Sequence, residues 1–329
     1  MTLCILEVGV IGISFKTAGL PLREAFARAA EVFADERAYF FPNPVICLST
    51  CERVEFYFSA PDLAEALVHL LAWLKRAIAE PFEHQPYTYF GLDAFVHLCR
   101  VTSGLDSAVV GESDIQRQVK VAYARAGERL PSCLHYVFQK ALRVSKGVRS
   151  QTACTANLYS AVWKIIEEHA SEYSQVLLVG YSEWNRGLLS FLQHKGVQNI
   201  SLITQSPDQI HLPIPVYGRE ELARWTDYDL IFCATTATDY LIYGSSPRKH
   251  LIFDLGVPRN VDPAVGLQEG VFLYNIEQID QQLEPSLSSP SEELVREHAL
   301  RLARLYRAKI LRGRGSGGRE SRLECFPSQ

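Results

Sequence analysis

The chain has 329 residues, of which 47% are hydrophobic and 21% charged. This length and balance exclude a single small module and a mainly disordered chain, and they predict two or three compact domains. The formal net charge of −4 excludes a uniformly basic protein, so a nucleic-acid partner would have to bind a local basic surface.

Cysteine usage and the N-terminal residues indicate a protein of the reducing cytoplasm. The eight cysteines are scattered and form no Cys-x-x-Cys pair, so neither a disulfide framework nor a structural zinc site is predicted. The first apolar run has no basic segment before it and no cleavage site after it. No apolar stretch approaches the ~20 residues that span a bilayer. We therefore expect neither a signal peptide nor a membrane span.

The first half of the chain mixes short strands with helices, which predicts an N-terminal α+β domain over residues 1–152. Apolar residues at helical spacing follow Asp62, which has the residue type of an N-cap. The predicted strands are residues 3–14 and two pieces of 45–58 around a break at 49–51, and the predicted helices are residues 22–34 and 62–79.

The second half indicates a doubly wound α/β domain. Its strands are continuous apolar runs separated by helical segments, which is typical of a parallel sheet covered on both faces. Together they predict a Rossmann-like domain over residues 153–285. The predicted strands are residues 176–179, 200–204, 230–234, 251–255 and 270–274.

A last helix follows the Rossmann-like pattern. Ser289 to Glu292 combine an N-cap, a proline at the first helical position and a capping-box glutamate. Apolar residues then mark one helical face as far as Arg312. We predict a connecting helix at residues 286–312 and a disordered tail, rich in Gly, Ser and Arg, at 313–329.

Cys51 lies at the break between the two predicted strands, and Arg53 follows two residues later. A thiol at such a turn can be exposed, and a nearby guanidinium favours the thiolate, which is the reactive form. Among eight cysteines, however, any one is more often a packing residue. The position alone leaves a nucleophile and a packing residue both open.

A second polar cluster runs from His97 to Ser107 and continues to Glu112 and Gln118. Polar groups between apolar stretches suit the wall of a pocket. Read alone, His97 is equally well a hydrogen-bonded helix histidine, and Ser107 a helix cap. The cluster by itself is a weak indication of a site.

Basic residues accumulate between positions 117 and 149. Eight are basic and one, Glu128, is acidic, and four of the basic residues recur at every third position from Lys140 to Arg149. A basic strip on a helix can contact a phosphate backbone, although solvated helix faces have the same composition. Nucleic-acid contact and a solvated face are equally compatible with this pattern.

The turn after residues 176–179 stands where a dinucleotide-binding G-x-G-x-x-G would lie. Only its first glycine is present, because serine and asparagine occupy the positions of the other two. After the next strand, residues 204–206 offer no acidic side chain for a ribose diol and no arginine for a 2′-phosphate. These segments therefore indicate the Rossmann-like fold more strongly than they indicate a bound dinucleotide. The turn residues are Gly180, Tyr181, Ser182, Glu183, Trp184 and Asn185.

Five segments stand out together, in this order along the chain: GISFKTAGLPLRE, LSTCERVE, GLDSAVVGESDIQRQVK, KGVRSQT and LIFDLGVPRNVDP. They resemble motifs of the glutamyl-tRNA reductase family, and they occur in the family's order. The second and third are the most specific, and the resemblance spans roughly residues 8 to 312. It implies a divergent bacterial member of the family with an N-terminal catalytic domain, a Rossmann-like NADPH domain and a shortened C-terminal dimerisation region.

The resemblance implies NADPH-dependent reduction of glutamyl-tRNA(Glu) to glutamate-1-semialdehyde with release of tRNA, the first step of tetrapyrrole (porphyrin and haem) biosynthesis from glutamate. Cys51 would attack the ester carbonyl and form a thioester, which hydride from NADPH would reduce. Arg53 would hold the glutamate carboxylate. Residues 180–185 would bind NADPH, and no metal is implied. The other pocket residues would be Thr50, His97, Ser107, Glu112 and Gln118, with His97 either orienting the substrate or assisting proton transfer.

The chain departs from the family pattern at several positions. Phe15, Glu52 and Asp114 stand where the family has histidine, asparagine and glutamine, and only one helix follows residue 290. The family would imply a homodimer and a glutamate-1-semialdehyde aminomutase as partners. Two alternatives are kept, namely a tRNA-binding or regulatory relative without reductase activity, and an NAD-dependent dehydrogenase of small tetrapyrrole precursors. The second alternative leaves the Cys51 motif unexplained.

Overall fold

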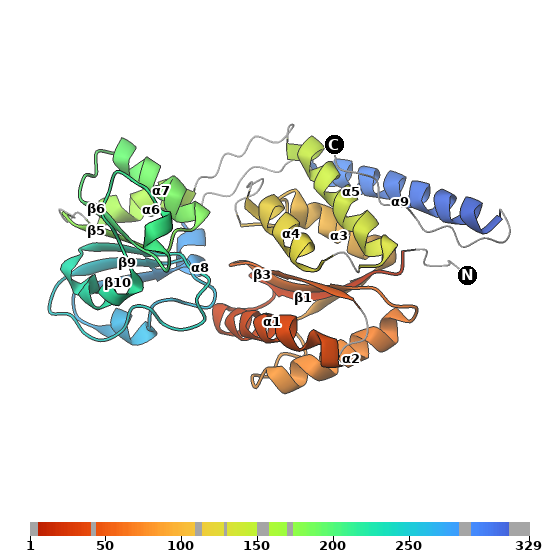
Figure 1. Ribbon diagram of the computed structural model, residues 1–329, viewed down its shortest axis with the longest axis horizontal. Coiled ribbons are helices and arrows are strands. Elements are labelled where there is room, and N and C mark those ends of the chain that lie inside the picture. The colour runs from red at the N-terminus through yellow and green to blue at the C-terminus, as the bar shows by residue number, and fades with distance from the viewer. Residues whose placement is uncertain are drawn as a thin grey trace.

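The computed structural model of this protein contains two β-sheets, and helices cover both faces of each sheet (Figure 1). The structure describes residues 6–40, 44–108, 114–127, 130–149, 158–169, 174–282 and 291–315. The predicted domain boundaries, 152/153 and 285/286, fall between these ranges and stay predictions. In the described residues, no helix is long and apolar enough to span a membrane.

The N-terminal domain contains a four-stranded antiparallel sheet with the order β2-β3-β1-β4. The break predicted between two strands is a tight connection between β2 and β3. Strand β1 begins at Gly9, so residues 6–8 of the predicted first strand are not part of it, and residues 3–5 lie outside the described residues. The strands are β1 (Gly9–Ser14), β2 (Val45–Ser49), β3 (Arg53–Phe58) and β4 (Tyr87–Phe90).

Both faces of this sheet are buried, since side chains alternate between two apolar layers along each strand. Val10 and Tyr57 face one layer, and Ile11, Phe56 and Phe58 face the other. Helices α1 and α2 cover the second face, and α3, α4 and α5 cover the first (Figure 1). These helices are α1 (Leu20–Phe40), α2 (Leu63–Ala77), α3 (Gly91–Thr102), α4 (Asp114–Arg125) and α5 (Ser132–Arg149).

Local sequence signals set the start of α2 as predicted. The carboxylate of Asp62 accepts hydrogen bonds from the backbone N–H groups of Ala64 and Glu65, so Asp62 is the N-cap. The helix ends two residues earlier than expected, at Ala77. Helix α1 is longer than its predicted range of 22–34 at both ends.

The second sheet has six strands in the order β10-β9-β8-β5-β6-β7, and all its pairings are parallel. The predicted apolar runs form five of these strands to within a residue. Strand β7 was not predicted, because it has only two residues and no apolar run. The strands are β5 (Val176–Val179), β6 (Ile200–Ile203), β7 (Val216–Tyr217), β8 (Leu230–Cys233), β9 (His250–Asp254) and β10 (Val271–Asn275).

Helices α6, α7 and α8 cover one face of this parallel sheet, and the short 3-10 helices η2 and η3 pack on the other. We call this sheet with its helices the Rossmann-like domain. Its helices are α6 (Leu158–Glu168), α7 (Glu183–His194) and α8 (Ile276–Asp280), with η1 (Pro207–Gln209), η2 (Arg219–Asp227) and η3 (Pro263–Leu267).

The last helix, α9 (Ser291–Gly315), lies against α3 and α5 of the N-terminal domain (Figure 1). Val295, Ala299 and Tyr306 are buried there, which agrees with the predicted apolar face. The helix continues three residues past Arg312, into the start of the predicted tail. The serine and proline of the predicted capping box, and residues 316–329, lie outside the described residues.

Candidate active site

Cys51 lies at the tip of the β2–β3 hairpin. The hydroxyl of Thr50 accepts hydrogen bonds from the backbone N–H groups of Glu52 and Arg53, both at 3.2 Å, which fixes the turn. The backbone oxygen of Cys51 accepts a hydrogen bond from the Arg23 guanidinium of α1. The Cys51 side chain is half-buried and packs against the apolar core of the Rossmann-like domain. The candidate nucleophile therefore lies where the two domains meet.

Directly behind this tip, a buried carboxylate collects four donors. One oxygen of Glu55 lies 2.8 Å from Nε2 of His97, 2.5 Å from the Tyr87 hydroxyl and 3.5 Å from Nη1 of Arg53. The other oxygen accepts a hydrogen bond of 2.7 Å from the Tyr57 hydroxyl. The structure thus brings together His97 and Arg53, two predicted site residues that are 44 positions apart in the sequence.

Glu55 stays ionised in this setting. Its burial alone would raise its pKa, but the positive charge and hydrogen bond of His97, the charge of Arg53 and the Tyr57 hydroxyl outweigh it and lower the pKa to about 2. Burial first, and then the charge of the same carboxylate, raise the pKa of Tyr57 and of Tyr87, so both phenols stay protonated and donate. Glu55 is therefore a fixed negative charge that holds His97 and Arg53 in place.

Arg53 is fully buried and paired on several sides. Burial alone would lower its pKa, but the neighbouring acidic groups, Glu55 first, raise it, so the side chain stays charged. Its Nη1 lies 3.0 Å from the Asp106 carboxylate, and its Nη2 donates to the Asp106 backbone oxygen. Lys16 Nζ lies 2.6 Å from the other oxygen of Asp106 and is half-exposed. Arg53 is thus held within a charged network that reaches the surface at Lys16.

Glu52, the residue in place of the family's asparagine, adds a second buried carboxylate beside Cys51. It accepts a hydrogen bond of 2.9 Å from the backbone N–H of Ala108. Burial raises its pKa, and the charge of Arg53 only partly opposes this. Asp280 of α8 is close enough that burial and the charge of Glu52 raise its pKa to about 7. Two carboxyl groups with raised pKa values, Glu52 and Asp280, therefore lie near the hairpin tip, and the Arg23 guanidinium partly opposes both shifts.

The remaining predicted pocket residues have fewer described contacts with the Arg53–Glu55–His97 network. Ser107 is buried and adjoins Asp106, the partner of Arg53. Gln118 lies half-buried on α4. Glu112 lies outside the described residues. In the described part of the chain, no group of three or more His, Cys, Asp or Glu side chains could hold a metal ion.

The predicted cofactor turn joins β5 to α7, and its backbone fits a dinucleotide-binding turn. Gly180 has φ of +92°, and a Cβ there would lie 2.7 Å from the backbone oxygen of Ala234, so only glycine suits the position. Ser182 is the N-cap of α7 and accepts a hydrogen bond of 3.1 Å from the Asn185 backbone N–H. The side chain of Asn185 turns inward and donates to the backbone oxygens of Val179 and Gly180.

The two lost glycines therefore change the turn without blocking it. Ser182 has φ of −72°, which any residue adopts, and Asn185 is 1% exposed, so its side chain leaves the outer surface of the turn open. The N-terminus of α7 remains available for a pyrophosphate, with the Asn185 N–H already occupied by Ser182. The residues present leave this helix N-terminus compatible with a dinucleotide pyrophosphate.

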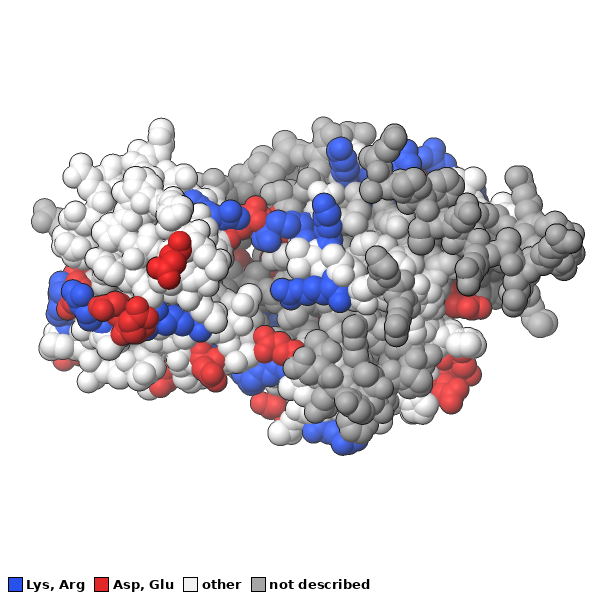
Figure 2. Space-filling model, in the orientation of Figure 1, with Lys and Arg blue, Asp and Glu red and all other residues white. Residues whose placement is uncertain are grey.

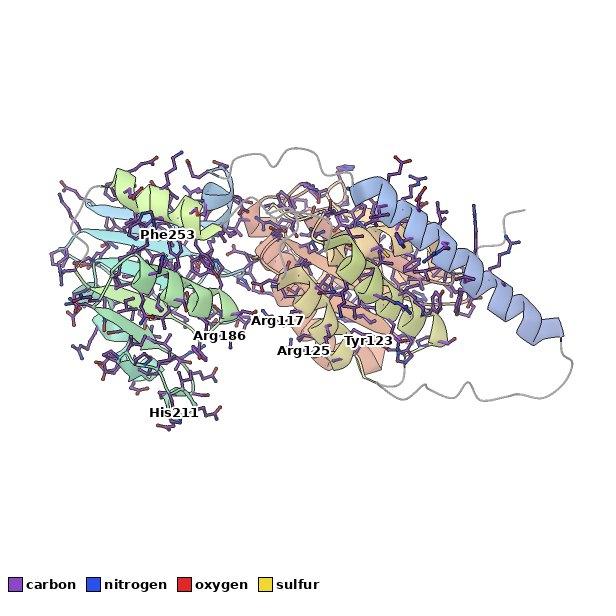
Figure 3. The ribbon with its side chains drawn as sticks, turned by 90° about the horizontal axis from the view of Figure 1, so that it is seen from above. Arg117, Tyr123, Arg125, Arg186, His211 and Phe253 are labelled. Atoms are coloured by element: carbon purple, nitrogen blue, oxygen red, sulfur yellow. The ribbon has the colours of Figure 1, made fainter. Side chains whose placement is uncertain are left out.

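Glu183, the first residue of α7, forms an ion pair with Arg117 of α4 in the N-terminal domain. Figure 3 shows Arg117 and Arg186 side by side where the two domains meet, and Arg125 farther along α4. Burial and the charge of Glu183 raise the pKa of Asp114 at the start of α4. The predicted cofactor turn and the helix that carries Gln118 are therefore in direct contact.

The sequence interpretation gave no site role to Glu55, Asp106 or Arg23, which hold the predicted residues in place. A signal for Glu55 was present, since Arg53, Glu55 and Tyr57 alternate along β3 and so share one face of a strand whose other face is aromatic. Arg23 and Asp106 lie in segments of the family resemblance, but they contact the hairpin from distant parts of the chain, and neither segment shows by itself that this residue holds Arg53 or Cys51.

Comparisons with known proteins agree with this architecture. The family model described as "Glutamyl-tRNAGlu reductase, N-terminal domain" matches residues 11–152, and the "Shikimate / quinate 5-dehydrogenase" model matches residues 163–282. The glutamyl-tRNA reductase of Chlamydia abortus is 32% identical over 306 residues, which cover 87% of this chain and 88% of that protein. The chain belongs to the glutamyl-tRNA reductase family. The family resemblance and the fold class predicted from the sequence are therefore confirmed.

Other members of the glutamyl-tRNA reductase family match over a similar extent. The Aquifex aeolicus protein is 30% identical over 321 residues, which cover 88% of this chain and 78% of that protein. The solved structure of the glutamyl-tRNA reductase from Methanopyrus kandleri is 24% identical and covers 94% of this chain and 80% of that chain, with a TM-score of 0.41.

Proposed function

We propose that this chain reduces glutamyl-tRNA to glutamate-1-semialdehyde through a thioester on Cys51, and so performs the tRNA-dependent first step of tetrapyrrole synthesis. Family membership supports the reaction. One observation carries the site assignment: Cys51 stands at the tip of a hairpin backed by the buried Arg53–Glu55–His97 network and faces the Rossmann-like domain. A tRNA-binding relative without reductase activity would not need Cys51 to contact the second domain.

In this proposal the thiolate of Cys51 attacks the ester carbonyl, the bond to the terminal ribose oxygen breaks, and that oxygen takes a proton as tRNA leaves. Arg53 binds the glutamate carboxylate by giving up one contact to Asp106, whose charge Lys16 at 2.6 Å continues to balance. His97, held by Glu55, lies on the same network and orients the substrate or moves the proton. Thr50, Ser107, Glu112 and Gln118 are proposed to line the pocket.

The reductase family and the dehydrogenase-type domain imply a nicotinamide cofactor. We propose NADPH, bound at the turn of residues 180–185. When bound, this cofactor supplies the hydride that converts the thioester to the aldehyde and returns the thiolate of Cys51. The contact between Cys51 and the Rossmann-like domain supports transfer across the domain boundary.

We propose that tRNA contacts the basic helices α4 and α5. Lys and Arg side chains gather over the region of α4 at the border between the domains (Figure 2). Arg117, Lys120 and Arg125 on α4 and Arg143 and Lys146 on α5 are exposed. This local excess can bind a phosphate backbone although the whole chain has a formal charge of −4.

The proposed setting is the cytoplasm, where charged tRNA and a reduced Cys51 are both available. A glutamate-1-semialdehyde aminomutase is the proposed recipient of the reactive aldehyde. A homodimer is proposed from the family alone.

The test is to incubate the protein with glutamyl-tRNA labelled in glutamate, without cofactor, and to quench in acid. We expect label on the protein, none on Cys51→Ser, and release of the label as an aldehyde when NADPH is added. Label that NADPH cannot release would identify a relative that has lost reduction, and the absence of label would leave only a binding protein.

A further inference from the structure

Two neighbouring residues of α1, one basic and one acidic, each form an ion pair with a residue of opposite charge in the Rossmann-like domain. Arg23 Nη2 lies 2.7 Å from a carboxylate oxygen of Glu277 on α8. Glu24 receives three hydrogen bonds from Arg259, namely from its backbone N–H at 2.7 Å and from Nε and Nη2 at 2.8 Å. Because the two pairs have opposite charge order, they favour one relative placement of the two domains. A shift that brought Arg23 towards Arg259, or Glu24 towards Glu277, would place like charges together.

The Arg259 side of this contact is held in place by buried hydrogen bonds. Arg259 lies in a loop fixed by the buried Asp254 carboxylate, which accepts hydrogen bonds from the backbone N–H groups of Gly256, Asn260 and Val261. The side chain of Arg23 is 2% exposed and that of Glu24 6%, so these charges are shielded from solvent. Buried charges that lack their partners are strongly unfavourable, which makes these contacts sensitive to substitution.

The same Arg23 also contacts the nucleophile. Its Nη1 donates to the backbone oxygen of Cys51 while its Nη2 pairs with Glu277. Leu20, one turn earlier on α1, is buried in the apolar core of the Rossmann-like domain, against which Cys51 also packs. A single guanidinium therefore links the second domain to the backbone of the residue that would carry the thioester.

We propose that Arg23 and Glu24 form a charge-reversed clamp that holds the Rossmann-like domain over Cys51, and that Arg23 is a positioning residue for the nucleophile. The clamp is the set Arg23, Glu24, Arg259 and Glu277. This inference rests on the proposed reaction. It predicts that the two half-reactions depend differently on the clamp, since tRNA transfers glutamate to Cys51 within the N-terminal domain, whereas the hydride comes from the other domain.

The first test uses Arg259→Gln, Glu24→Gln and the exchanged double variant Glu24→Arg/Arg259→Glu. Acylation of Cys51 by glutamyl-tRNA without cofactor, and the release of the acyl group on addition of NADPH, are measured in single turnovers. Each single variant should slow release at least ten-fold and leave acylation within two-fold, and the exchanged variant should recover at least half of the lost rate. Small-angle X-ray scattering should show a larger radius of gyration for the single variants and a return in the exchanged variant.

Glu221→Gln is the matched control, because the exposed pair of Glu221 with Arg224 lies within η2 and spans no boundary. This variant should keep the wild-type rates of acylation and release and the wild-type radius of gyration. The clamp would be overturned if the single variants released the acyl group at the wild-type rate and kept the wild-type radius of gyration. It would also be overturned if the exchanged variant had the slow release and the large radius of gyration of the single variants. A wild-type protein that fails to acylate would refute the proposed function instead, and the scattering comparison would still test the clamp.

Arg23→Lys tests the positioning role separately. Lysine keeps the charge for Glu277 but cannot reach two partners with one planar fork. The acylation rate should fall at least ten-fold while the affinity for glutamyl-tRNA and the radius of gyration stay at wild-type values. An unchanged acylation rate in this variant would overturn the positioning role of Arg23.

Discussion

Replacing Glu55 with glutamine should destabilise the protein strongly at neutral pH. The buried charge of Arg53 would lose one of its counter-charges and His97 would lose its charged hydrogen-bond partner, and removing one partner of a buried pair typically costs about 3–5 kcal/mol. The lowering of the Glu55 pKa from 4.5 to about 2 corresponds to about 3 kcal/mol of folding free energy. Because the folded pKa is lowered, this stabilisation is present above about pH 4.5 and is lost as the pH falls towards 2.

Urea unfolding followed by circular dichroism at pH 7 and pH 3 measures this effect. The wild type should exceed Glu55→Gln by about 3 kcal/mol at pH 7, and about 2 kcal/mol of that difference should disappear at pH 3. Glu52→Gln is the matched control, since the raised pKa of Glu52 means that its charge opposes folding, and its loss should leave stability at pH 7 unchanged or increased. A difference for Glu55→Gln below about 1 kcal/mol, or one that does not vary with pH, would refute this account of the network.

Three further substitutions probe other parts of the site. Cys51→Ser should abolish acylation by glutamyl-tRNA while tRNA binding, measured by filter retention, stays at the wild-type value. Gly180→Ala would place a methyl group 2.7 Å from the Ala234 backbone oxygen, and it should abolish NADPH binding measured by calorimetry. Gly196→Ala is its control: φ is also positive there, at +87°, but no atom lies near the added methyl group, so the free energy of unfolding should fall by only about 1 kcal/mol. Arg143→Gln should reduce the slope of log affinity for tRNA against log salt by about one, and an unchanged slope would exclude α5 from the tRNA surface.

Much of the fold follows from local patterns. Continuous apolar runs predicted five of the six parallel strands, because a strand buried on both faces has no polar alternation. Asp62 was predicted as a cap because an N-cap bonds only to residues two and three positions away. Strand β7 was missed, since its position depends on pairing with β6 and not on its own residues.

The site could be predicted only where its residues are close in sequence. Cys51 and Arg53 share one hairpin, so a single motif identified both. The partners of that hairpin come from far along the chain: Asp106 lies 53 positions from Arg53, and Glu277 lies 254 positions from Arg23. Such pairs depend on how the sheet and the two domains assemble, and no local periodicity encodes that.

The most direct test of the proposed reaction follows the hydride itself. NADPH carrying deuterium at C4 of the nicotinamide is added to the acylated protein, and the aldehyde product is analysed by mass spectrometry. The account predicts one deuterium at C1 of glutamate-1-semialdehyde for the wild type and no deuterated product for Cys51→Ser. Deuterated aldehyde from Cys51→Ser would contradict the thioester route, and free glutamate without deuterium from the wild type would contradict the reductase activity.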